Sequence, residues 1–249
     1  MSEIKVKTIE PSTGTNLTLG ASGDTIAVSS DALKVDVWKD SGGNALFQSD
    51  GAGTLSNVSG SLLAGPQLIS TNDFTGQTTV SITTGIDSSY DQYKFQFTNV
   101  YCSTNAAKLT WNASIDGGSN YNVAKTTAVY QENQYQSNAD YGVNADTGGT
   151  LGNQNTTGNT MIFQRIANYA DVGMCGYIYL ATPSSTTYQK HFYTRLHSTD
   201  CGPSANPPQN NSMTWQVNGR FHTTSAIDAI QFQISTGTFS GTIKLYGIA

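Results

Sequence analysis

Apolar and polar residues alternate with a period of two through most of the chain from Gln67 onward. Between residues 93 and 98, for example, every odd position is aromatic and every even position is polar. The same pattern recurs at 109–115, 215–221 and 230–234. A period of two is typical of strands with one buried face, and no ten-residue stretch carries a convincing helical stripe. The pattern therefore predicts an all-β fold with almost no helix.

The number of such segments favours an antiparallel β-sandwich. Further strands are expected at residues 78–83, 123–131, 160–166, 172–181, 188–197 and 241–246. The composition agrees, because only 12% of residues are charged, while Gly (25 residues) and Tyr (13 residues) are abundant. Thr, Tyr, Val and Ile suit pleated strands, and Gly suits tight turns. About ten strands make a sandwich of two packed sheets.

The first sixty residues have a different character. Residues 9–26 and 37–55 each have the pattern of a short strand, a glycine turn, a second strand and another turn. Hairpins so poor in apolar residues are marginal alone and are expected to pair with other copies of the chain. The composition changes at the small-residue segment 60–66, so we expect a stalk at 1–65 and a β-sandwich knob at 66–249. The expected trimer core of the stalk consists of Leu17, Leu19, Ile26, Leu46, Phe47 and Leu55.

Two polar segments interrupt the alternation of the knob. Residues 132–158 are rich in Asn, Gly and Gln and include Tyr135 and Tyr141, while residues 198–212 contain three prolines. Loops of this length are unusual in compact domains and are often functional. We expect both segments to be loops that carry specificity.

The segment 191–197 has a more specific pattern. As a strand, it places His191, Tyr193, Arg195 and His197 on one face and apolar residues with Thr194 on the other. The polar row is a candidate ligand surface for a sugar, but a polar outer face or a subunit contact explains it as well and is favoured, because antiparallel sheets are commonly polar on one side. A metal site at the two histidines is less favoured. The candidate receptor or glycan surface is Tyr135, Tyr141, His191, Tyr193, Arg195 and His197.

Motifs for catalysis are absent from the sequence. The chain has three histidines and lacks a HExxH motif, a Gly-x-Ser-x-Gly elbow and a P-loop. A pair of carboxylates brought together by the fold remains an open alternative, with Asp140, Asp146, Asp171 and Asp200 as candidates. The segment 116–121 lacks the regular ligand spacing of a calcium loop and is interpreted as a hairpin turn. We expect no enzymatic activity, no cofactor and no metal.

Charge and cysteine content restrict the expected partners. The formal net charge is −5 without a basic block, which argues against binding to nucleic acid. No stretch approaches the apolar length of a membrane span, and the first residues lack the apolar core of a signal peptide, so we expect cytoplasmic assembly without membrane insertion. Cys102, Cys175 and Cys201 are interpreted as small buried hydrophobic residues.

Several segments resemble fibre and spike proteins of tailed bacteriophages, particularly marine and cyanobacterial phages. The resemblance lies in residues 7–26 and 45–55 at the amino-terminal end and in residues 237–248 in the last expected strand. Residues 90–95 and 115–121 are similar in style, whereas the two polar segments have no counterpart. The resemblance implies a homotrimeric protein of the virion surface, with a carboxy-terminal jelly-roll knob and an amino-terminal segment that docks on other capsid or tail proteins.

Three functions follow as expectations. The first is a trimeric fibre or spike of the phage head or tail, whose knob attaches to a host receptor or cell-surface glycan. The second is a capsid decoration or cement protein without a receptor. The third is a free carbohydrate-binding module.

Overall fold

The computed structural model describes residues 37–40, 42–49, 55–56, 58, 65–135, 141–145, 155–199 and 211–249. The chain divides into two compact units, Met1–Leu63 and Ala64–Ala249, which are described separately. The division expected from the sequence lies between residues 65 and 66.

The described part of the first unit is a small antiparallel sheet. Strands β1 (Val37–Lys39), β2 (Ala45–Ser49) and β3 (Leu55–Ser56) pair in the order β1-β2-β3. The carboxylate of Asp40 closes the turn between β1 and β2, since its Oδ1 accepts hydrogen bonds of 2.8 Å from the backbone amides of Gly42 and Asn44. The rings of Trp38 and Phe47 stack with centroids 5.7 Å apart.

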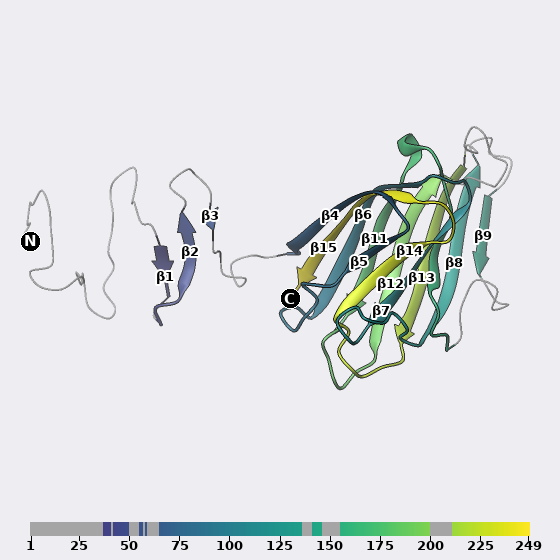
Figure 1. The fold of residues 1–249 in the computed structure, drawn as a ribbon. Coiled ribbons are helices and arrows are strands. Elements are labelled where there is room, and N and C mark those ends of the chain that lie inside the picture. The colour runs from purple at the N-terminus through teal and green to yellow at the C-terminus, as the bar shows by residue number, and fades with distance from the viewer. Residues whose placement is uncertain are drawn as a thin grey trace, which may run out of the picture. The chain divides into compact units, whose positions relative to one another are not determined.

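The second unit is a sandwich of a four-stranded and an eight-stranded antiparallel sheet (Figure 1). The four-stranded sheet has the order β10-β7-β14-β5, and the eight-stranded sheet has the order β4-β15-β6-β11-β12-β13-β8-β9. The strands are β4 (Gln67–Gln77), β5 (Thr79–Ile82), β6 (Gln92–Cys102), β7 (Ala107–Ser114), β8 (Lys125–Tyr135), β9 (Tyr141–Ala145), β10 (Thr160–Ile166), β11 (Met174–Ala181), β12 (Lys190–Thr199), β13 (Asn211–Phe221), β14 (Ala229–Ile234) and β15 (Phe239–Ile248). The described residues include no α-helix, only the 3-10 turn η2 (Ala170–Val172). The all-β prediction is confirmed.

Eight of these twelve strands form a jelly roll. When β4, β5, β6, β7, β10, β11, β14 and β15 are numbered one to eight in chain order, the two sheets have the orders 1-8-3-6 and 5-4-7-2. Each sheet then alternates early and late strands, which is the double Greek-key connectivity of jelly rolls. The first and last strands lie side by side, because β4 pairs with β15 over most of its length.

The remaining four strands enlarge one sheet. The hairpin β8-β9 is inserted between β7 and β10, and the hairpin β12-β13 is inserted between β11 and β14. Strand β12 pairs with the free edge of β11, β13 pairs with β12, and β8 pairs with β13. An unpaired strand edge leaves a row of backbone donors and acceptors without partners. The inserted strand β12 supplies these partners along the edge of β11 that the jelly roll alone would leave exposed.

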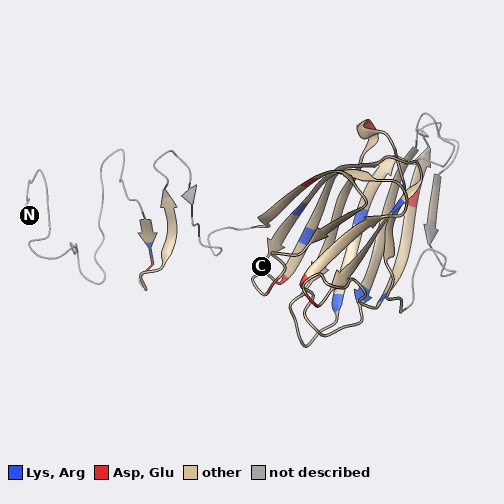
Figure 2. Cartoon of the chain, in the orientation of Figure 1, with Lys and Arg blue, Asp and Glu red and all other residues tan. Residues whose placement is uncertain are grey.

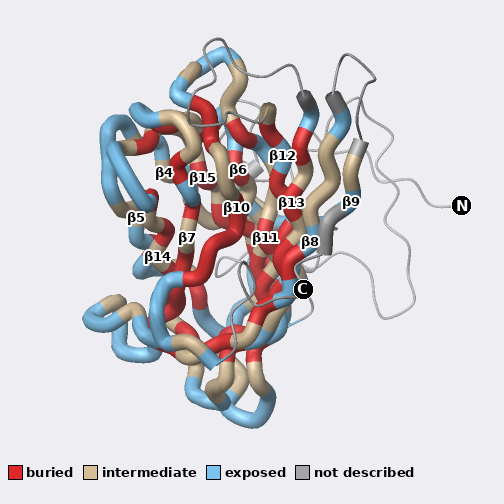
Figure 3. Tube along the Cα trace, turned by 90° about the vertical axis from the view of Figure 1, so that its right-hand side faces the viewer, coloured by how far each residue is buried: buried red, intermediate tan, exposed pale blue. Residues whose placement is uncertain are grey.

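The core fills the space between the sheets. Figure 3 shows the buried segments along the strands and the exposed ones mainly in the connections. The Trp111 ring on β7 contacts Phe192 of the inserted β12 at 4.8 Å in a T-shaped arrangement and stacks 6.2 Å from Phe232 of β14. The Phe163 ring on β10 likewise contacts Trp215 on β13 at 6.3 Å. Inserted strands and jelly roll therefore share one aromatic core.

The expected strands agree closely with the observed ones, but β4 was not among them and the first polar segment differs from expectation. Residues 132–135 continue β8, and residues 141–145 form β9, although a loop was expected over 132–158. The register explains the difference, because β13 offers a backbone partner to every residue of β8 as far as Tyr135. Polar side chains are compatible with a strand when its backbone is paired and one face is solvated. Residues 200–210 of the second segment lie outside the described residues.

Of the expected trimer core, Leu46 and Phe47 are half-buried on β2. Leu55 belongs to β3, but its side chain lies outside what the structure describes. Leu17, Leu19 and Ile26 lie outside the described residues. Trimer formation remains a prediction.

Candidate functional site

The outward face of the eight-stranded sheet presents the polar row of β12. Burial alternates strictly along this strand, with His191, Tyr193, Arg195 and His197 exposed and the intervening residues buried against the core. The predicted division of the segment into two faces is confirmed. Whether the outward row binds a ligand depends on the neighbouring strands.

Three tyrosines meet where β11 and β12 pair. The rings of Tyr179 and Tyr193 are stacked, with centroids 4.8 Å apart and planes inclined by 21°. Tyr177 contacts Tyr179 edge to face at 5.1 Å. Tyr193 retains 46% exposure, and its pKa is raised above the ordinary value by burial and by the two neighbouring phenols. These three side chains form a partly exposed cluster of contacting rings.

A lysine connects these rings to a tyrosine on β15. The Nζ atom of Lys94 on β6 lies 5.8 Å from the ring centroid of Tyr177 and 5.6 Å from that of Tyr246 on β15. A cation within about 6 Å of a ring face is attracted by the ring quadrupole. The tyrosine–lysine cluster, defined as Lys94, Tyr177, Tyr179, Tyr193 and Tyr246, therefore spans four adjacent strands.

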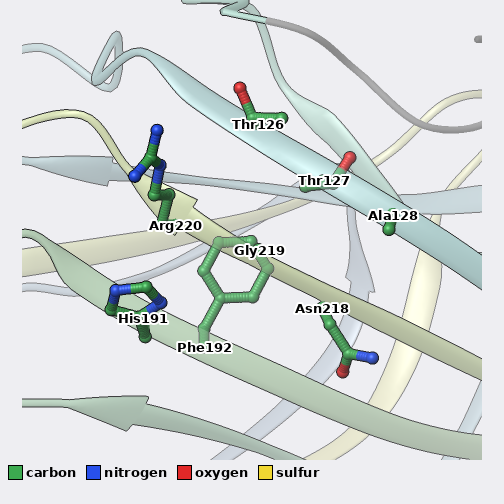
Figure 4. Close-up of a pocket in the computed structure, with 8 residues that line it drawn as sticks. All are labelled: Thr126, Thr127, Ala128, His191, Phe192, Asn218, Gly219 and Arg220. Carbon is green, nitrogen blue, oxygen red and sulfur yellow. The ribbon is translucent and has the colours of Figure 1, made fainter.

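A pocket of about 420 Å³ adjoins the cluster on β12, β13 and β8 (Figure 4). In the sheet register, His191 is opposite Arg220, and Asn218 is opposite both Tyr193 and Ala128. One end of the pocket thus carries two basic side chains, and the other end includes Asn218, which is opposite Tyr193 of the cluster in the sheet register. The lining residues are Thr126, Thr127, Ala128, His191, Phe192, Asn218, Gly219 and Arg220.

The backbone below the pocket needs glycine at position 219. A Cβ atom there would lie 2.4 Å from the backbone oxygen of Thr126 and 2.7 Å from Cζ of Phe192. Figure 4 shows the Phe192 ring next to Gly219. The absence of a side chain at Gly219 therefore lets three strands and a core phenylalanine pack closely beneath the pocket.

Two buried lysines lie close to the basic end of the pocket. Lys125 and Lys190 are both opposite Phe221, one register step beyond the pocket. Lys125 Nζ donates to the backbone oxygens of Gly158 (2.7 Å) and Val123 (3.3 Å), and burial lowers its pKa to about 7. Lys190 Nζ donates to the oxygens of Ser185, Tyr188 and Thr223, at 2.6, 3.0 and 3.3 Å, and burial lowers its pKa as well. Both lysines tie connecting loops to the strands, which is a structural role.

The histidines do not form a chelating pair. His197 Nδ1 is 3.1 Å from the Thr214 hydroxyl, and its Nε2 is 3.4 Å from that of Ser212, so this ring is engaged with β13. His191 is six residues away along the same strand, or roughly 20 Å at 3.3 Å per residue. Within the described residues, no group of three or more His, Cys, Asp or Glu side chains is placed to hold a metal ion.

Residues 116–121 form a turn closed by their own side chains, but the expected hairpin is wrong, because the flanking strands β7 and β8 belong to different sheets. The Asp116 carboxylate accepts hydrogen bonds from the Ser114 hydroxyl (2.7 Å) and from the backbone and side-chain nitrogens of Asn120 (2.9 and 2.7 Å). These bonds, with that of the Asn120 side chain the largest contribution, lower the Asp116 pKa to about 2.

The cysteines were predicted to be buried. Cys102 is buried in the core, but Cys175 is exposed on β11, opposite His197, so the prediction is wrong for Cys175. Side chains alternate between the two faces of a strand, so Cys175 lies on the same outward face of β11 as Tyr177 and Tyr179. Cys201 lies outside the described residues.

The remaining predicted site residues are placed only in part. Tyr135 ends β8 opposite Asn211 of β13, and Tyr141 begins β9 opposite Gln134 of β8, but the side chains of both tyrosines lie outside what the structure describes. Among the four candidate carboxylates, only Asp171 is described, in the turn η2. The sequence-based site missed Lys94, Tyr177, Tyr179, Asn218, Arg220 and Tyr246. Their alternation marks them as outward, but only the strand order places them beside β12.

Comparison of the chain with protein-family models, with curated protein sequences and with solved structures finds no match. Among the described residues, no helix has the length and apolar character needed to cross a membrane. The site is therefore interpreted from its own residues.

Proposed function

We propose that this protein is a structural component of a bacteriophage virion. It forms a homotrimeric surface fibre or spike, with an amino-terminal segment that docks on capsid or tail proteins. The jelly-roll unit is a knob that attaches the particle to the host surface, with a glycan as receptor. The protein performs no catalytic step in this role.

The single observation that carries the proposal is the enlarged sheet of the jelly roll with its aromatic outward face. Tyrosines supply large, rigid and amphipathic contact area at low cost in conformational entropy. On this sheet they lie beside a pocket with His191, Asn218 and Arg220, whose polar groups can orient a ligand. The resemblance of residues 7–26, 45–55 and 237–248 to phage fibres supports the virion assignment.

A cement protein of the capsid is the main competing function. It would use the same fold to stabilise the shell and would bind no receptor. A free carbohydrate-binding module is a second competitor, and it would need neither a trimer nor a docking segment.

Two measurements test the proposal. Purified protein is expected to adsorb to host cells and to block infection by competing with the virus; failure to adsorb would favour the cement protein. Analytical ultracentrifugation is expected to find a trimer for the full chain and its loss when residues 1–65 are deleted. A monomeric full chain, or a trimer that survives the deletion, would contradict the fibre.

A further inference from the structure

The five adjacent strands that carry the tyrosine–lysine cluster and the two basic pocket residues contain no carboxylate. Strands β15, β6, β11, β12 and β13 include neither Asp nor Glu, although the chain has 17 such residues and a net charge of −5. The same strands place Lys94, Arg195, Arg220 and Lys244 on the outward face. These five strands thus carry cations and no carboxylate, although the chain as a whole is negative; Figure 2 marks Lys and Arg in blue along the ribbon.

Cations and tyrosines lie opposite one another on neighbouring strands, in two rows that cross the sheet. In one row, Lys94 is opposite both Tyr246 and Tyr179, and Tyr179 is opposite Tyr193. In the neighbouring row, Arg195 is opposite Tyr177. Within the part of the chain that the structure describes, none of the four outward cations forms an ion pair. Cations that have no carboxylate partner among the described residues can contact an anionic ligand.

We propose that this face binds an anionic polysaccharide, a chain of sugar rings that carry carboxylate or sulfate groups. The sugar rings would lie on the tyrosines, and the anionic groups would contact Lys94, Arg195 and the basic end of the pocket. Arginine suits this role because its planar fork matches the oxygens of a carboxylate or sulfate. The inference rests on the proposed attachment function and names the chemical class of its receptor.

The charge also disfavours a two-fold contact of this surface with the same surface of another copy. A symmetry mate that presented the same face would bring like charges together, and such juxtaposition is strongly unfavourable at interfaces. An acidic polymer instead satisfies the cations and covers the exposed rings. Its extended shape matches rows that cross several strands, each step being about 4.8 Å.

The direct test is binding of the full-length protein to three polymers of matched length: a polyuronate, dextran sulfate and neutral dextran. Binding is measured by biolayer interferometry at low and high salt. At least one of the two anionic polymers should bind tighter than neutral dextran by about tenfold or more, and added salt should weaken that binding because it screens exposed charges.

Variants locate the site. Arg195→Gln and Arg220→Gln should each weaken binding of the anionic polymer by about tenfold, the loss expected for one charge-assisted hydrogen bond. Tyr179→Ala should weaken it several-fold. Lys108→Gln is the matched control, because Lys108 is an exposed lysine on β7 in the other sheet and should leave binding unchanged. Thermal unfolding of each variant verifies that the fold is retained.

Several outcomes would overturn the inference. Equal binding of neutral and anionic polymers, or binding to none of the three, would exclude an anionic polysaccharide; if the protein still adsorbs to host cells, the attachment function stands without it. Equally tight binding of single-stranded DNA would indicate a general polyanion surface. Dissociation of the oligomer by Tyr179→Ala or Arg195→Gln would identify the face as a subunit contact. Loss of host adsorption altogether would instead contradict the proposed function.

Discussion

Tyr179 and Tyr193 stack with ring centroids 4.8 Å apart across the seam between β11 and β12. Tyr179 belongs to the sixth strand of the jelly roll, whereas Tyr193 belongs to an inserted hairpin. The pair therefore exists only because the insertion extends the sheet in register. The same seam brings the basic pocket of the inserted strands beside the tyrosines of the jelly roll, so the candidate site is a product of the insertion.

The two faces of β12 predict opposite responses to truncation. Phe192→Ala removes a buried ring that contacts Trp111 and Phe221, and it should lower the free energy of unfolding by about 3–5 kcal/mol. Tyr193→Ala removes an exposed ring and should cost about 1 kcal/mol or less. Urea unfolding of both variants measures the difference. Similar losses for the two variants would contradict the assignment of faces.

Gly176 on β11 should tolerate no side chain. Its φ is +138°, and a Cβ atom would lie 2.1 Å from the backbone oxygen of Arg195 on β12. Gly176→Ala should therefore lower the free energy of unfolding by about 2–4 kcal/mol by forcing the seam apart. Gly117→Ala is the matched control, since Gly117 also has a positive φ (+70°) but open space around its Cβ position, and it should cost only about 1 kcal/mol. Equal losses of unfolding free energy in the two variants would show that β11 and β12 can move apart at little cost.

Lys125 should make stability depend on pH above neutrality. Its folded pKa of about 7 lies below the ordinary value of 10.5, so between these two values the unfolded chain binds a proton that the folded chain has released. The free energy of unfolding should therefore rise with pH above 7, by up to about 1.4 kcal/mol per pH unit. Unfolding measured from pH 7 to 9 tests this dependence. Lys125→Met should flatten it, and Lys108→Met should leave it unchanged; an unaltered slope in Lys125→Met would refute the role of burial.

Asp116 should contribute stability that is lost in acid. Its pKa is lowered from 3.8 to about 2 in the folded state, so the contribution is complete above pH 4 and disappears as the pH falls toward 2. Asp116→Asn should reduce the pH dependence of unfolding in this interval. Asp73→Asn is a suitable control because Asp73 is also exposed and has one side-chain partner, the Thr242 hydroxyl. A full acid transition in Asp116→Asn would assign the effect to other carboxylates.

Local pattern was sufficient for most strand positions. The alternation at residues 191–197 correctly separated Phe192 and Leu196 from Tyr193 and Arg195, because each side chain of a strand alternates sides whatever the partner strand is. It was insufficient where polarity suggested a loop. Residues 132–135 form a strand because β13, which is distant in the sequence, supplies their backbone partners, and residues 141–145 pair in turn with β8.

The candidate site could be predicted only in part for the same reason. His191 and Arg195 were recognisable from one strand, whereas Lys94 and Tyr246 come from strands about 100 and 50 residues away. Alternation states that these residues point outward but carries no information on which strands are neighbours. The pocket depends further on Gly219, where a close approach of three strands becomes visible only in their packing.

The sequence by itself determined that this protein is all-β, which residues of each strand face the core, and where the low-apolar amino-terminal segment gives way to aromatic strands. Those properties follow from side-chain alternation and backbone preference, which act over a few residues. Only the tertiary structure decided that two inserted hairpins extend the first, eighth, third and sixth strands of a jelly roll. That order depends on hydrogen bonds and core contacts between distant segments, and it is what assembles the tyrosines, the cations and the pocket on one face.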